Sequence, residues 1–144
     1  MSKRHSWKKA GILDGHIYYY GKDDNWWIAG EEGPCGPDTE MFYDTGKPAC
    51  GPDCQPSCDC GKYVEIWNNV FMEYFKDKDG NYSKLSQRNV DTGLGLERMT
   101  MLLQGKETPF DTELFKPVMD KLLELQKIDN IESRRIIAEH LRSS

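Results

Sequence analysis

The run from Asn89 to Arg98 joins a carboxylate, two glycines and an arginine. The carboxylate of Asp91 can bind an ammonium group, and the guanidinium of Arg98 can bind a phosphate. Gly93 and Gly95 would let a ligand approach the backbone. These groups suit a site that holds an amino acid beside a nucleotide. The same residues can also form a simple helix start, with Asp91 as the N-cap.

Asn68 is the second residue that could bind a ligand. It lies on the largely apolar face of a segment that alternates over residues 63–75. A buried amide needs hydrogen-bond partners, because leaving it unpaired costs a few kcal/mol. Asn68 is therefore either satisfied by neighbouring backbone or oriented toward the carboxylate of a ligand.

Four of the five cysteines crowd into a segment rich in glycine and proline, with the spacing Cys50-x3-Cys54-x3-Cys58-x-Cys60. Four thiolates can complete a tetrahedral zinc site, and a segment this poor in apolar residues would gain stability from one. The spacing differs from the usual paired C-x2-C, so free thiols in a flexible loop are the alternative. Cys35 stands apart, and we expect it to be structural.

The elements that position these residues follow from periodicity and turn signals. Residues 25–35 and 46–61 are rich in Gly or Pro and are expected to be irregular. Residues 7–11 read as a helix tail that ends at Gly11. The strands that we expect cover residues 16–20, 39–44, 63–75 and 82–85, with a hairpin turn at residues 78–81.

The last third of the chain has helical periodicity. We expect a helix over residues 96–103 that stops at Gly105, and another over residues 131–141. Between them, residues 114–123 predict a helix that is capped by Asp111 or Thr112, with Pro117 near its start. The fold class is therefore α+β: an antiparallel sheet flanked by C-terminal helices. We expect one domain over residues 1–144, with residues 1–92 mainly strands and loops and residues 93–144 mainly helices.

The bulk composition excludes some classes of function. The net charge of -5 argues against a protein whose main role is to wrap nucleic acid. No apolar stretch is long enough to cross a bilayer, and no apolar segment follows the basic residues at the N-terminus. We therefore expect a cytoplasmic protein with no membrane partner.

Several motifs in one order resemble the later part of the catalytic domain of alanyl-tRNA synthetases. The resemblance extends from about Trp7 to Ser144 and includes residues 136–143 near the end of the chain. The motifs that carry it are Asn25-Trp26-Trp27, Gly33-Pro34-Cys35-Gly36-Pro37, residues 39–44, residues 65–72 and Val90 to Arg98.

This resemblance implies a class II synthetase core, which activates alanine with ATP and Mg²⁺ and then charges tRNA(Ala). Asp91 matches the aspartate that holds the ammonium of alanine, and Asn68 matches the asparagine on the carboxylate side. Trp27 matches the tryptophan that walls the small pocket, and Gly93 matches the glycine that lines it.

The resemblance also implies a place for the ATP phosphates. The stretch from Gly93 to Arg98, which includes Gly95, looks like the third class II signature. The arginine of that signature contacts the phosphates, so Arg98 is the expected catalytic residue. Such a reaction would depend mainly on positioning and charge stabilisation.

The first and second class II signatures of the family precede the region that this chain matches. We therefore expect a fragment or split half that is inactive alone, whose partner is the missing half of the synthetase or a second copy of itself. The alternatives are a non-catalytic binding or interaction domain that stands alone, and a small ligase that uses alanyl-adenylate for another purpose.

Overall fold

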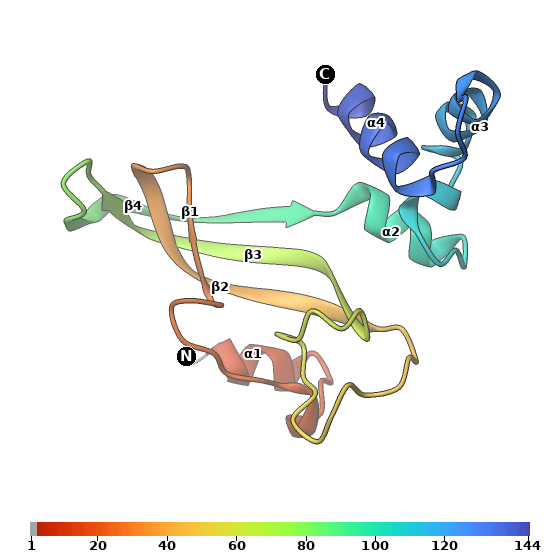
Figure 1. Ribbon diagram of the computed structural model, residues 1–144. Helices are drawn as coiled ribbons and strands as arrows, with labels where there is room; N and C mark the ends of the chain where they lie inside the picture. Colours follow the sequence, from red (N-terminus) through yellow and green to blue (C-terminus); the bar gives the residue numbers. More distant parts are fainter. Residues whose placement is uncertain (1–2) are drawn as a thin grey trace. The chain divides into compact units, whose positions relative to one another are not determined.

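A computed structural model describes residues 3–144. The chain divides into two compact units, with the boundary between Gly93 and Leu94. The first unit contains the sheet and the second contains the C-terminal helices (Figure 1). The α+β class that the sequence predicts is therefore confirmed. Each unit is described in turn.

The first unit is built on a four-stranded antiparallel sheet in which spatial order follows chain order. The strands are β1 (Trp26–Ile28), β2 (Gly33–Asp44), β3 (Tyr63–Lys76) and β4 (Tyr82–Leu94). Within the described residues, β4 is the last strand of the sheet and β3 is its one strand neighbour. The sheet therefore has a long strand at one edge.

The hairpin of β3 and β4 confirms the prediction made from alternation and turn residues. The carboxylate of Asp77 accepts hydrogen bonds from the backbone N–H groups of Asp79 and Asn81, both at 2.9 Å. Gly80 has φ +83°, which other residues rarely adopt. The strand that follows is longer than the expected 82–85, because it continues to Leu94. Asp91 therefore lies within a strand, and the N-cap interpretation of Asp91 is wrong.

Strand β2 begins earlier than residues 39–44 predict. The expectation that residues 25–35 are irregular is wrong in part, because β1 and the start of β2 both fall there. Pro34 and Pro37 lack an N–H but keep an extended φ, so they cost ladder bonds without ending the strand. Between the pairs Cys35–Tyr74 and Asp38–Val70, β2 has one residue fewer than β3. The extra residue of this β-bulge therefore belongs to β3.

In the N-terminal segment, the predicted helix is present but the predicted strand is not. Helix α1 (Lys3–Lys9) is followed by Gly11, with φ +92°, as predicted. The strand predicted over residues 16–20 is wrong: a short 3-10 helix, η1 (Asp14–His16), precedes extended residues outside the sheet. The rings of Tyr18 and Tyr20 stack with centroids 6.4 Å apart. Tyr18, Tyr19 and Tyr20 line a cavity of about 910 Å³ together with residues of β2 and β3.

The second unit contains three α-helices around a small core. They are α2 (Leu96–Leu103), α3 (Lys116–Leu125) and α4 (Ile131–Ser143), with a short 3-10 helix, η2 (Pro109–Asp111), before α3. Its buried residues are Met101, Thr112, Phe115 and Ala138. Helix α2 is followed by Gly105 with φ +60°, and α4 is capped by the side chain of Asn130, both ordinary helix-end devices.

The cap predicted for the middle helix is wrong. The Thr112 hydroxyl donates to the carbonyl of Pro109 at 2.5 Å, so it belongs to the preceding turn. Phe115 occupies the N-cap position without a side-chain hydrogen bond, and the helix starts at Lys116. Pro117 lies in the first turn as expected, because its missing N–H has no helical partner there. Among the helices described for residues 3–144, none is long and apolar enough to cross a membrane.

Candidate functional site

Asn68 lies in the middle of β3 within a small polar cluster. Its amide nitrogen donates to a carboxylate oxygen of Glu40 at 3.1 Å and to one of Asp38 at 3.4 Å. Asn25 donates to the other carboxylate oxygen of Asp38 at 3.4 Å. The side chain of Asn68 is thus held by side chains, and the interpretation in which backbone satisfies it is wrong. Its amide oxygen is buried without a protein partner among the described residues.

Trp27 shares a face of the sheet with this cluster. It pairs with Gly36, which lies two residues before Asp38 on β2, and side chains two residues apart point to the same face. Trp26 points to the other face, where its ring centroid lies 5.6 Å from that of Tyr74. Trp27 is 38% exposed, so its ring forms part of the surface of that face.

Strand β4 brings Asp91 close to Asn68 along the sheet. The hydroxyl of Thr92 donates to the backbone carbonyl of Asn68 at 3.2 Å. Asp91 is exposed, and its carboxylate accepts the N–H of Thr92 at 2.8 Å. A Cβ added at Gly93 would meet nothing within 4 Å. Three of the predicted alanine-site residues therefore lie on adjoining stretches of β3 and β4.

Asp38, Glu40 and Asn25 belong to this region, although the sequence interpretation did not select them. The signal that was present is the alternation of two acidic residues, Asp38 and Glu40, of which only Glu40 lies within the strand expected over residues 39–44. It became meaningful only with the register, which pairs Glu40 with Asn68. Cys35 is fully buried in β2, and burial raises the pKa of its thiol. Its predicted structural role remains consistent with this position.

The predicted phosphate-site residues lie in the second unit, at the start of α2. Gly95 is the N-cap of this helix and Arg98 lies in its first turn. A Cβ added at Gly95 would lie 3.2 Å from Cδ of Arg98 and 3.4 Å from its Cβ. The absence of a side chain at residue 95 therefore lets the aliphatic part of Arg98 lie against the backbone.

An ion pair within the second unit links α2 to α4. The Nε of Arg142 donates to a carboxylate oxygen of Glu97 at 2.8 Å, and its guanidinium carbon lies 5.6 Å from the ring centroid of Phe115. The hydrogen bond from Arg142 lowers the pKa of the Glu97 carboxyl. Because Glu97 precedes Arg98, this pair helps to fix the helical turn that carries the predicted phosphate ligand.

We expect Glu97→Gln to destabilise the chain in a pH-dependent way. The folded-state pKa of Glu97 is lowered, so the pair stabilises the fold above the unfolded-state pKa of about 4.3 and its contribution is lost as the pH falls through the folded-state value. Both side chains are 36% exposed, so the effect at pH 7 should not exceed about 1 kcal/mol. Urea unfolding at pH 7 and at pH 3 measures it.

Glu113→Gln, which removes an exposed carboxylate from the same unit, is the control for this measurement. The Glu97 variant should differ from the wild type at pH 7, and the difference should be smaller at pH 3. An equal deficit at both pH values would contradict the electrostatic explanation.

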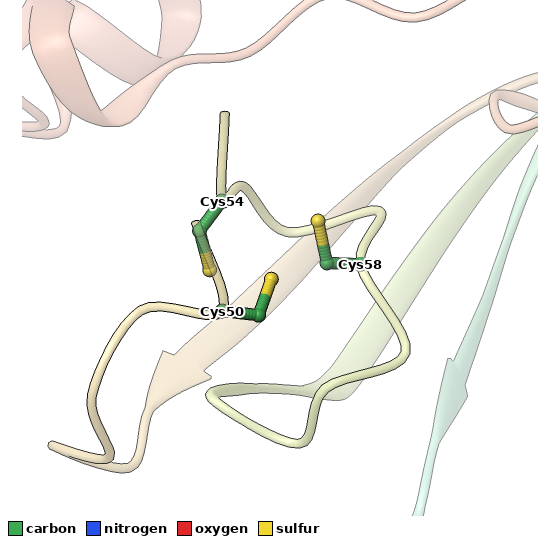
Figure 2. A group of neighbouring side chains, drawn as sticks. All are labelled: Cys50, Cys54 and Cys58. Atoms are coloured by element: carbon green, nitrogen blue, oxygen red, sulfur yellow. The ribbon is translucent and has the colours of Figure 1, made fainter. Parts of the chain in front are cut away.

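The cysteine segment folds as an irregular loop between β2 and β3, as predicted (Figure 2). The sulfur atoms of Cys50, Cys54 and Cys58 all lie within 4.8 Å of one another. The sulfur of Cys60 lies 3.7 Å from that of Cys54. Hydrogen bonding with the thiols of Cys54 and Cys60 raises the pKa of Cys50 to about 12, whereas a backbone hydrogen bond from Lys62 lowers the pKa of Cys60. All four predicted ligands are thus close together.

Comparison with known proteins places these features in a family. The family model described as tRNA synthetases class II (A) matches residues 2–144. The chain belongs to this family. Among the curated relatives of this class II synthetase domain, the alanine–tRNA ligase of Treponema denticola is 51% identical over 145 residues. The corresponding ligase of Treponema pallidum is 48% identical over 146 residues, and that of Petrotoga mobilis is 43% identical over 145.

The synthetase domain covers only part of these relatives. The two Treponema alignments include 96% of this chain and 24% of each relative. The Petrotoga alignment includes 92% of this chain and 16% of the relative. The chain therefore spans about a quarter or less of the length of these ligases.

Proposed function

We propose that this chain is part of an alanine–tRNA ligase and supplies one side of the site where alanine reacts with ATP. Support comes from the ligase relatives together with one structural observation. Asn68 and the Asp91–Thr92 stretch adjoin on neighbouring strands through the hydrogen bond from Thr92 to the carbonyl of Asn68. An amide and a carboxylate on neighbouring strands suit the two charged ends of an amino acid.

In this proposal, Asp91 binds the ammonium of alanine, and Asn68 binds its carboxylate. The amide nitrogen of Asn68 already donates to Asp38 and Glu40, so a bound carboxylate would replace those hydrogen bonds. Trp27 walls the pocket on the same face as Asp38, and Gly93 leaves room beside Asp91. A small pocket of this kind suits a methyl side chain.

ATP, carried as its Mg²⁺ complex, is the second substrate. An oxygen of the alanine carboxylate forms a bond to the α-phosphorus, and pyrophosphate leaves with the electron pair of the broken bond. Arg98 would act as the catalytic cation that stabilises charge on the phosphates, and Gly95 would let it lie close to the backbone. Preorganised charge of this kind supplies much of the rate acceleration in enzymatic reactions at phosphorus.

The remaining partners in this proposal are tRNA(Ala), bound through the complete enzyme, and the other part of the synthetase. Strand β4 is 13 residues long and lies at the end of the sheet. An edge strand presents backbone groups that another strand can pair with. We propose that the rest of the synthetase core, or a second copy of this chain, covers this edge.

A chimera tests the proposed function. The matching segment of the Treponema denticola ligase is replaced with this chain, and alanine-dependent ATP–pyrophosphate exchange is measured. We expect exchange by the chimera and none by the isolated 144-residue chain, because the residues proposed here supply one arginine and one side of the pocket.

The outcomes separate the proposal from its alternatives. A folded chimera without exchange would contradict a role in alanine activation. Exchange by the isolated chain would refute its dependence on another part of the enzyme and favour a small independent ligase. Calorimetric binding of alanine by the isolated chain, combined with an inactive chimera, would identify a non-catalytic binding domain.

A further inference from the structure

The loop that connects β2 to β3 cannot be held by a hydrophobic core of its own. Between Gly46 and Gly61, apart from cysteines and prolines, the one apolar side chain is that of Ala49. Ordering a residue costs about 1–2 kcal/mol of backbone entropy, and this loop has little apolar surface to offset that cost. A cross-link would supply the missing stabilisation, and cysteine is the side chain that the loop has in excess.

The sulfur atoms have the spacing of ligands around one ion. Four sulfurs at about 2.3 Å from a tetrahedral Zn²⁺ lie about 3.8 Å from each other. The Cys54–Cys60 distance is 3.7 Å, and the sulfurs of Cys50, Cys54 and Cys58 are within 4.8 Å of one another. A disulfide would require about 2.05 Å. The sulfurs of Cys50, Cys54 and Cys58 therefore surround a common centre, and the sulfur of Cys60 lies beside this group, against that of Cys54.

The backbone of the loop supports this arrangement. A turn from Gly51 to Cys54 and a second from Gln55 to Cys58 are closed by hydrogen bonds of 3.3 and 2.9 Å. The N–H of Gln55 also points at the sulfur of Cys58, at 3.5 Å. Hydrogen bonds to the ligand atoms are a regular feature of metal sites, because they orient the ligands.

The charges beside the loop fit a bound ion as well. Zinc with four thiolates carries a net charge of -2. The ammonium of Lys62 donates to the carbonyl of Lys47 at 3.0 Å and pairs with Asp44 at 2.8 Å. The ammonium of Lys47 lies 3.5 Å from the place that a Cβ on Gly61 would occupy. Two lysine ammonium groups, one of them paired with Asp44, therefore lie at the Cys60 end of the loop.

We propose that Cys50, Cys54, Cys58 and Cys60 bind one structural Zn²⁺ as four thiolates. The ion joins the two turns of the loop and fixes its position against the ends of β2 and β3. Pro56 lies between Cys54 and Cys58 along the chain, and it lines the cavity that is also lined by Tyr18, Tyr19 and Tyr20. The ion thus also fixes one wall of that cavity. This site does not depend on the proposed role of Asp91, Asn68 or Arg98.

The test begins with the unmodified 144-residue chain, purified under reducing conditions without a chelator. Elemental analysis should find one zinc per chain, and a thiol reagent should reach the four loop cysteines only after EDTA is added. Chain reconstituted with Co²⁺ should show the visible absorption of tetrahedral cobalt and a thiolate-to-cobalt charge-transfer band. These measurements need no variant, so they do not depend on how a mutant folds.

Variants then identify the ligands. Cys54→Ser should weaken zinc binding by more than the 10- to 100-fold that loss of a supporting residue causes. Cys60→Ser should bind Co²⁺ more weakly and reduce the charge-transfer band, because three thiolates remain. Cys35→Ala, which removes the buried thiol of β2, is the matched control and should keep one zinc.

Four results would overturn the proposal. Zinc content no higher than in a variant with serine at all four loop positions would exclude the site. Immediate reaction of the loop thiols without EDTA would indicate free cysteines. Disulfides found by mass spectrometry of the unreduced protein would replace the ion with a covalent link. Bound iron in place of zinc would reject the assigned metal.

Discussion

Gly36→Ala should lower the free energy of unfolding by about 3 kcal/mol, at the upper end of the range for an overpacked interior, or prevent the first unit from folding. A Cβ at Gly36 would lie 1.9 Å from the backbone oxygen of Phe71 and 2.9 Å from its carbonyl carbon. Both atoms belong to the neighbouring strand, so no side chain can rotate to make room. Strands β2 and β3 would have to separate at the bulge, with loss of ladder hydrogen bonds.

Urea unfolding of the complete chain, followed by circular dichroism, measures this effect. Gly15→Ala is the matched control, because a Cβ there would meet nothing within 4 Å and the residue has no positive φ. The control should remain within about 0.5 kcal/mol of the wild type or be slightly more stable. A Gly36 variant that unfolds at the wild-type urea concentration would show that the two strands are not packed this closely.

Asp91→Asn should raise the KM for alanine about 10- to 150-fold in the chimeric ligase. A hydrogen bond to a charged group contributes about 1.5–3 kcal/mol, and each 1.4 kcal/mol corresponds to a factor of ten. The ammonium is bound in both the ground state and the transition state, so kcat should change little. The KM for ATP should also remain unchanged, because Asp91 is proposed to contact alanine alone.

Asp79→Asn removes the same charge from the turn at the other end of the β3–β4 hairpin and serves as the control. It should leave both KM values at the wild-type level. The role of Asp91 would be rejected by an unchanged KM for alanine, or by equal effects of the two substitutions. A selective rise in the KM for ATP would instead assign Asp91 to the nucleotide.

The parts of the fold that sequence predicted well are those in which local pattern and turn chemistry agree. Strand β3 (Tyr63–Lys76) forms where the alternating segment over residues 63–75 predicted a strand, and the turn at Gly80 supplies the positive φ that the hairpin needs. The predictions that were wrong concern segments whose conformation depends on tertiary contacts. Residues 17–20 have strong strand propensity, yet they lie outside the sheet, where their tyrosines line a cavity together with residues of β2 and β3. Pro34 and Pro37 suggested a loop, but β2 retains them because pairing elsewhere along it holds the strand.

In the candidate site, too, the sequence predicted residue types but not the tertiary arrangement. Residue type identified Asn68 and Asp91 as groups for the two ends of an amino acid, and the family resemblance gave each a role. Sequence could not supply the register that brings Glu40 opposite Asn68, or the β1–β2 pairing that puts Trp27 on the face of Asp38. The Glu40–Asn68 pairing depends on the residue added in β3 between the pairs Cys35–Tyr74 and Asp38–Val70, and a one-residue shift reverses which face a side chain occupies.

The simple strand order of the sheet also has a kinetic consequence. Every strand pairs with its chain neighbour, so the sheet can form by successive hairpins, and local contacts favour fast folding. The connections differ in length: residues 77–81 join β3 to β4, whereas residues 45–62 join β2 to β3. Closing the longer connection costs about 1 kcal/mol more in chain entropy. The β3–β4 hairpin should therefore form first, and β2 should join it in a slower step that the cysteine loop controls.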